Sequence, residues 1–135
     1  MDYKIQEIEG IGPAYGEKLA AAKINSTGHL LKQCATRSGR KQAAEATGVS
    51  ETLLLKWTNL ADMMRIKGIG PQFAELLEAA GVDTVKELAQ RNAENLAGKM
   101  AEVNTVKNLT NALPASSIIS GWIDTAKTTE PGISY

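Results

Sequence analysis

Apolar residues recur every three or four positions along most of the chain, while strictly alternating apolar and polar runs are rare. Ala, Leu, Glu, Lys, Met and Gln fill the long stretches between loops, and these residues favour helices. The clearest apolar stripe comprises Leu53, Leu54, Trp57, Leu60 and Met64. The pattern therefore predicts an all-α protein.

Capping residues and apolar spacing predict where the helices begin and end. In the first half we expect helices over about residues 3–8, 13–23, 27–33 and 38–48, the last one capped by Ser38 and ended by Gly48, followed by the longest helix, which starts at Ser50. In the second half we expect helices over 71–80, from a capping box at 84–87, over 93–101 and 105–112, and over 116–127, the last with Ile119, Trp122, Ile123 and Ala126 inward.

The most specific feature of the sequence is a motif that occurs twice. Gly10-Ile11-Gly12-Pro13 returns as Gly68-Ile69-Gly70-Pro71, an offset of 58 residues between positions 10 and 68. The match extends to Gly16 and Ala74, Glu17 and Glu75, Leu19 and Leu77, and, at an offset of 65, to Trp57 and Trp122 and to Ala61 and Ala126. This indicates a duplicated chain in which one loop has changed length.

Each residue type in the repeated motif has a physical reason. Glycine adopts positive φ without strain and lets a backbone approach a neighbour closely. Proline is tolerated at the first position of a helix, where its missing N–H has no partner to lose. The motif therefore predicts a tight loop that opens a helix at Pro13 and again at Pro71.

These residues resemble the helix-hairpin-helix motif of DNA repair polymerases, ligases and nuclease subunits. Each motif covers about twenty residues. The whole chain also resembles a prokaryotic family of tandem helix-hairpin-helix proteins of unknown function, through its opening and through the segments 60–70 and 80–88. The resemblance implies duplicated helix-hairpin-helix repeats packed as one pseudo-twofold helical domain, with repeats over about 1–65 and 66–128 and a tail over 129–135.

The resemblance also implies a site. In the DNA-binding motif, backbone N–H groups of the hairpin and the following helix N-terminus hold a phosphate. Carried over, the phosphate-binding residues are Gly10, Ile11, Gly12 and Lys18 in the first copy and Lys67, Gly68, Ile69 and Gly70 in the second. Some members bind K+ or Na+ through hairpin carbonyls, which map to Gln6, Ile8 and Ile11 and to Met64, Ile66 and Ile69. No other cofactor is implied.

Several positions depart from the DNA-binding pattern. The basic residue that commonly follows the Gly-x-Gly-Pro is replaced by Ala14 and Gln72, and Leu76 stands where the first copy has Lys18. Glu9 would repel a phosphate at the first hairpin. The 15 basic and 15 acidic residues give a net charge of zero, so any duplex binding should be weak at physiological salt.

Other residues offer little chemistry. The chain has one cysteine, Cys34, and one histidine, His29, and no recognisable nucleophile or phosphate-binding lysine loop, so we expect no enzyme and no small-molecule substrate. Trp57 and Trp122 are interpreted as core residues more readily than as a base-stacking platform. The basic stretch 37–41 is interpreted as a solvated helix start in preference to a phosphate site. With no apolar leader or spanning segment, a soluble cytoplasmic protein is expected.

Three interpretations of the glycine loops stay open. They connect helices that pack closely, they contact nucleic acid, or they bind another protein. The leading functional hypothesis is a non-enzymatic module that contacts the nucleic-acid backbone without regard to sequence. The alternative is a protein-interaction or scaffold domain that keeps the fold without DNA binding, which the net neutrality and the residues Ala14, Gln72 and Leu76 favour.

Overall fold

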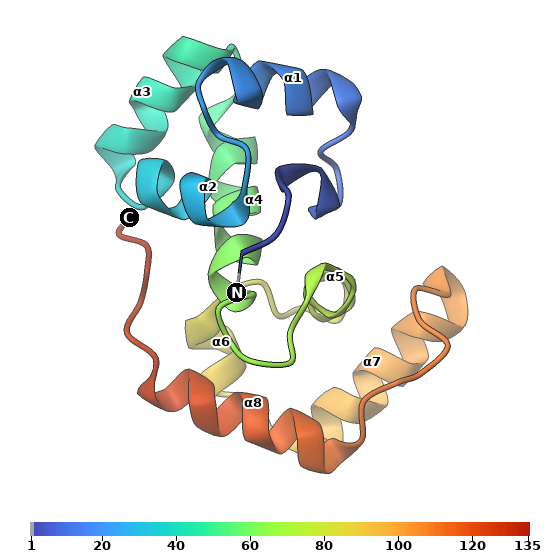
Figure 1. The fold of residues 1–135 in the computed structure, drawn as a ribbon. Coiled ribbons are helices and arrows are strands. Elements are labelled where there is room, and N and C mark those ends of the chain that lie inside the picture. The colour runs from blue at the N-terminus through green and yellow to red at the C-terminus, as the bar shows by residue number, and fades with distance from the viewer. Residues whose placement is uncertain (1) are drawn as a thin grey trace. The chain divides into compact units, whose positions relative to one another are not determined.

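The computed structural model describes residues 2–135. Within this range the chain forms eight α-helices and one 3-10 helix. Figure 1 shows the helices along the chain. The described residues contain no strand, and an isolated bridge pairs Lys4 with Ser26. The prediction of an all-α protein is confirmed.

The chain divides into two compact units. One consists of Met1–Asp62 together with Pro131–Tyr135, and the other of Met63–Glu130. The first contains η1 (Ile5–Glu7), α1 (Pro13–Ala21), α2 (Thr27–Cys34), α3 (Arg37–Thr47) and all but the last residue of α4 (Glu51–Met63). The second contains α5 (Pro71–Ala79), α6 (Val85–Ala89), α7 (Ala93–Lys107) and α8 (Ser116–Thr128).

The core of the first unit is built from the apolar faces of its helices. Buried side chains come from every element of the unit, among them Ile5, Ile8, Leu19, Ile24, Leu30, Leu54 and Trp57. The predicted stripe on α4 is confirmed at Leu54, Trp57 and Leu60, whereas Leu53 is only half-buried. Met64 is buried as predicted but lies just beyond the end of the helix. The 13 residues of α4 do not make it the longest helix, since α7 has 15.

The start of α3 differs from the prediction. Thr36 caps this helix, because its side-chain oxygen accepts a hydrogen bond from the Gly39 N–H at 2.9 Å, and Ser38 lies inside the first turn. The predicted end is confirmed, since Gly48 adopts a left-handed conformation with φ 75°. Glycine takes this conformation without the penalty of a side chain.

In the second unit, α7 replaces two predicted short helices. The stretch 101–104 contains no helix breaker, so the helix continues to Lys107 and ends where Asn108 takes φ 49°. The side-chain oxygen of Asn104 then accepts hydrogen bonds from the N–H groups of Leu109 (2.7 Å) and Thr110 (3.1 Å). These bonds hold the chain in an irregular loop, so the helix predicted over 105–112 is wrong.

The last helix, α8, agrees closely with its prediction. It starts at Ser116, and the four residues expected to face inward are all buried: Ile119, Trp122, Ile123 and Ala126. No helix within residues 2–135 has the length and apolarity needed to cross a membrane.

The end of the chain is extended but not detached. Ile133 is buried, and the Ser134 N–H donates to the Ala35 carbonyl at 2.8 Å. The Tyr135 hydroxyl lies 2.8 Å from the Asn59 side-chain oxygen. The last five residues therefore belong to the packing of the first unit.

Candidate phosphate-binding hairpins

The loop before α1 is a tight hairpin. The Ile8 N–H donates to the Ile5 carbonyl at 3.2 Å, and the Ile11 N–H donates to the Ile8 carbonyl at 3.1 Å. Gly10 turns the chain with φ 92°, a value that side-chain-bearing residues rarely adopt. Gly12 then stands at the N-cap of α1, with Pro13 in the first turn.

The loop before α5, in the other unit, has the same internal geometry. The Ile66 and Ile69 N–H groups donate to the carbonyls of Met63 and Ile66, both at 3.0 Å. Gly68 has φ 95°, and Gly70 stands at the N-cap of α5 with nearly the same dihedral angles as Gly12 (φ −93° and ψ −174°, against −82° and −172°).

The correspondence continues past the two helices. After α1, Lys23 has φ 64° and the Ile24 N–H donates to the Leu19 carbonyl at 2.9 Å. After α5, Gly81 has φ 95° and the Val82 N–H donates to the Leu77 carbonyl at 2.8 Å. These pairs again lie 58 positions apart. The backbone therefore follows one path twice.

Both paths end in a side-chain cap. Ser26 caps α2 by accepting from the His29 N–H at 3.1 Å, and Thr84 caps α6 by accepting from the Glu87 N–H at 3.0 Å. His29 is an exposed residue of the α2 start, and its ring nitrogen accepts a hydrogen bond from the Asn25 N–H at 3.2 Å.

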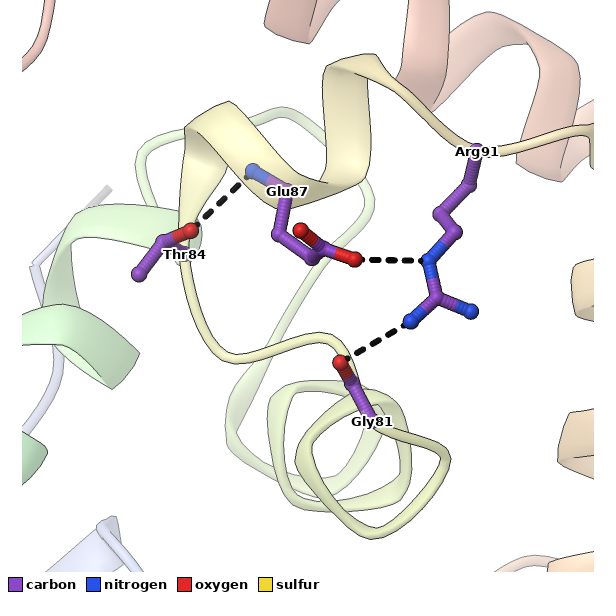
Figure 2. A network of polar contacts seen from close by, with 4 residues as sticks. All are labelled: Gly81, Thr84, Glu87 and Arg91. Atoms are coloured by element: carbon purple, nitrogen blue, oxygen red, sulfur yellow. Dashed lines mark hydrogen bonds and ion pairs between the residues drawn. The ribbon is translucent and has the colours of Figure 1, made fainter.

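The capping box predicted at 84–87 forms only in part. As Figure 2 shows, the Glu87 carboxylate turns to the Arg91 Nε at 3.0 Å, and another guanidinium nitrogen of Arg91 donates to the Gly81 carbonyl at 3.1 Å. Because Arg91 competes for this carboxylate, Thr84 supplies the cap alone. The network fixes the turn that follows α5.

A buried tryptophan lies against the first glycine of each hairpin. The Trp57 Nε1 would lie 3.4 Å from a Cβ built at Gly10, and the Trp122 Nε1 only 2.8 Å from one built at Gly68. Only 1% and 4% of these tryptophans is exposed. The predicted core role of both is confirmed, and the sequence alone did not reveal that each one supports a hairpin.

Each indole also contacts an aromatic residue of the helix that the hairpin opens. The rings of Tyr15 and Trp57 are 5.2 Å apart and inclined at 67°, and those of Phe73 and Trp122 are 5.5 Å apart and inclined at 50°. Such edge and tilted arrangements are favourable for aromatic pairs. The hairpin, the helix and the tryptophan thus form one packed group in each unit.

The helices that follow the hairpins lack a capping side chain. Neither Gly12 nor Gly70 provides one, and α8 also starts without one, at Ala115. Side chains cap the other α-helices, α2, α3, α4, α6 and α7. The first N–H groups of an α-helix have no partner inside the helix. Together with the helix dipole, they form a positive end that is available to an anion.

The expected phosphate donors divide into two groups. The N–H groups of Ile11 and Ile69 are used inside the hairpins, in the bonds to Ile8 and Ile66, and both side chains are buried. Gly12 is exposed and has open space beside its Cα, since a Cβ there would meet no atom within 4 Å. This geometry identifies Gly12 as the candidate donor of the first hairpin. Gly70 has the corresponding position in the second hairpin and is half-buried.

Charged and polar residues around the hairpins differ between the two copies. Lys18 and Glu9 are exposed at the first, with the Lys18 Nζ 5.6 Å from the centre of the Tyr15 ring. Lys67 is exposed at the second. There the Gln72 side chain donates to the Leu109 carbonyl, and Leu76 is buried.

A shallow groove of about 540 Å³ lies beside the first hairpin. Its walls are formed by Gln6, Ile11, Gly12, Pro13, Gly16, Glu17 and Ala20. The Gln6 side chain packs over Gly16, where an added Cβ would come within 3.1 Å of it. A side chain at position 16 would therefore require the Gln6 side chain to shift.

The hairpin carbonyls expected to bind K+ or Na+ are partly engaged. Those of Ile8 and Ile66 each accept one hydrogen bond, from Ile11 and Ile69, which leaves each oxygen one further lone pair. Among residues 2–135, no group of three His, Cys, Asp or Glu side chains is placed to hold a metal ion.

The basic stretch 37–41 is not a solvated face throughout. Arg40 is buried, and its guanidinium donates to the carbonyls of Cys34 (3.0 Å), Ala35 (3.3 Å) and Ser134 (2.9 Å). The Tyr135 ring lies 6.0 Å from it. The interpretation of this residue as solvent-exposed is wrong, because the chain end supplies acceptors that no local pattern indicates.

The fold and the hairpins define the class of protein: an all-α chain with two glycine-proline hairpins, each supported by a tryptophan. A family model described as Domain of unknown function (DUF4332) matches residues 9–129, and the chain belongs to this family. No curated protein and no solved structure matches the chain.

Proposed function

We propose that the chain consists of two helix-hairpin-helix motifs and that both bind the phosphate backbone of nucleic acid, without regard to sequence and without catalysis. The recurrence of hairpin, helix and turn with the same hydrogen bonds supports the duplication. In line with the resemblance, we place the protein in the cytoplasm of a prokaryotic cell.

The observation that carries the proposal is the pair of uncapped helix starts. Gly12 and Gly70 leave the N-termini of α1 and α5 without a capping side chain. Each helix start follows a hairpin whose glycines have no side chain and whose central isoleucine is buried. An anion supplied by a ligand would satisfy those N–H groups. The phosphate group of a nucleic-acid strand has the required charge and acceptor oxygens.

The charged side chains around the hairpins determine how tightly we expect each hairpin to bind nucleic acid. At the first hairpin the negative charge of Glu9 offsets the positive charge of Lys18, whereas Lys67 adds a positive charge at the second. Ala14 and Gln72 add none. Since neutralised phosphates supply most non-specific affinity, few contacts give weak and salt-sensitive binding. We therefore propose that the second hairpin binds more tightly than the first.

Fluorescence anisotropy with labelled duplex and single-stranded DNA at low salt tests the proposal. The double variant Gly12→Glu, Gly70→Glu places a carboxylate at each helix start and should abolish binding. The double variant Gly98→Glu, Gly121→Glu is the matched control, since both glycines are exposed and have open space beside them. Unchanged binding by the hairpin variant, or no binding by the wild type, overturns the proposal.

A second candidate, a protein-interaction domain, is favoured by one observation on the second unit. Val106 in the last turn of α7 is 86% exposed, Leu113 in the following loop 43%, and Ile118 in the first turn of α8 53%. Clustered exposed apolar residues commonly mark interaction surfaces. Failure of the DNA titration together with self-association or partner binding that Val106→Asp removes would favour this candidate.

A further inference from the structure

Each hairpin lies beside a polar group that has no partner in the protein. Trp57 and Trp122 are more than nine-tenths buried, and the nitrogen of each indole is the first atom that a Cβ built at the first hairpin glycine would meet. Within residues 2–135, no acceptor takes a hydrogen bond from either indole N–H. Neither nitrogen is a fully buried polar atom lacking a partner, so each N–H reaches the surface at its hairpin.

The hairpin glycines keep these N–H groups uncovered. A methyl group at Gly10 or Gly68 would come within 3.4 Å or 2.8 Å of the indole nitrogen. The absent side chain thus has a second consequence besides positive φ, because it leaves a donor at the floor of the hairpin open to a small acceptor. The same arrangement occurs in both units.

Packing alone does not account for this choice of residue. The aromatic contacts with Tyr15 and Phe73 would also be available to a phenylalanine. An indole adds an N–H group, which each hairpin leaves at the surface, where water or a ligand oxygen can accept a hydrogen bond from it. Two such groups, each at a hairpin glycine, point to an acceptor that comes from outside the protein.

We propose that Trp57 and Trp122 are direct donors to the bound anion, so that each hairpin holds a phosphate through an indole N–H as well as through the backbone N–H of Gly12 or Gly70. This inference rests on the proposed function and adds to it the side chain that recognises the ligand. A phosphodiester has two unesterified oxygens, and each of them can accept a hydrogen bond. The ligand class is therefore a phosphate with at least one unesterified oxygen.

Nuclear magnetic resonance on the wild-type, ¹⁵N-labelled chain tests the inference without altering the protein. The chain has two tryptophans, so its spectrum contains two indole N–H signals. Titration with a short DNA duplex at low salt should move both indole signals and the Gly12 and Gly70 amide signals. Each indole signal should give the same dissociation constant as the amide signal of its own hairpin.

The outcomes separate the inference from the function on which it rests. If the two amide signals move and the indole signals do not, the indole inference is overturned while the phosphate-binding proposal stands. If neither the amide nor the indole signals move, the proposed function fails and the inference fails with it.

Variants give a second measurement. Trp57→Phe and Trp122→Phe keep an aromatic ring and remove the N–H, and each should weaken duplex binding about tenfold, as expected for a lost hydrogen bond to a charged group. Tyr15→Phe is the matched control, since it removes a hydroxyl group from the ring beside Trp57 and leaves the indole in place. Equal affinity of the tryptophan variants and the wild type, with folding verified by circular dichroism, contradicts the inference.

Discussion

Gly68 lies so close to Trp122 that a Cβ at position 68 would come within 2.8 Å of the indole nitrogen. The corresponding distance between Gly10 and Trp57 is 3.4 Å, an ordinary van der Waals contact. The two hairpins share one backbone path, but the second tolerates less bulk beneath it. This difference allows the roles of conformation and contact to be measured separately.

Alanine substitution should destabilise the protein more at Gly68 than at Gly10. Gly68→Ala combines strain at positive φ with a steric clash and should cost about 2–4 kcal/mol of the free energy of unfolding. Gly10→Ala carries the strain alone and should cost about 1–2 kcal/mol. Urea denaturation followed by tryptophan fluorescence measures both.

Two further glycines serve as controls for this series. Gly12 has negative φ and open space, so Gly12→Ala should cost less than about 1 kcal/mol. Gly98 lies exposed within α7, where alanine should stabilise the helix by about 0.5–1 kcal/mol. Equal costs at positions 10, 12 and 68 would contradict the described hairpin geometry.

The bonds that Arg40 makes to three carbonyls predict a large effect of its removal. Arg40→Met keeps an apolar stem but leaves those acceptors without their charged donor, so we expect a loss of about 2–4 kcal/mol in stability. Exchange of the Ser134 N–H with solvent should accelerate at the same time. Arg37→Met, at an exposed position of the same helix, should change stability by less than about 0.5 kcal/mol.

Cys34 should be unreactive in the folded protein. Burial raises the pKa of its thiol, against smaller opposing effects of Thr58 and Arg40, and the thiolate is the form that attacks reagents. Because the folded-state pKa lies above the unfolded one, folding favours the neutral thiol, and this contribution to stability is lost as the pH rises through the folded pKa. Labelling by Ellman's reagent at neutral pH should therefore follow unfolding. Rapid labelling under native conditions would be the contrary result.

The charges beside the hairpins predict opposite effects on duplex affinity. Lys67→Glu should weaken binding, and Glu9→Lys should strengthen it and increase the magnitude of the salt slope, by about one unit if one phosphate contact is gained. Glu45→Lys makes the same charge change at an exposed position of α3 and is the control. An equal gain from Glu9→Lys and Glu45→Lys would show that net charge matters and the hairpin does not.

The sequence predicted the parts of the fold that depend on local chemistry. Gly-Pro pairs correctly marked the starts of α1 and α5, Gly48 marked the end of α3, and the apolar spacing of α8 identified its buried face. These features depend on residues within a few positions of one another, which explains why they could be predicted from the sequence alone.

Features that depend on distant residues were missed. The burial of Arg40 requires Ser134, which lies 94 positions away, and the support of each hairpin by a tryptophan joins the first and last parts of a unit. The loop after α7 was also missed, and a second helix was predicted over 105–112 in its place. The side-chain bonds of Asn104 that shape this loop leave no apolar pattern in the sequence. A pseudo-twofold packing of the two repeats stays a prediction.

The central claim is that the two hairpins contact backbone phosphates, and the salt dependence of duplex affinity tests it most directly. Two duplexes of unrelated sequence should bind equally well, and log K should fall linearly with log salt concentration, with a slope near −2 for about two phosphate contacts. Affinity that differs strongly between the two duplexes, or that does not respond to salt, would contradict the claim.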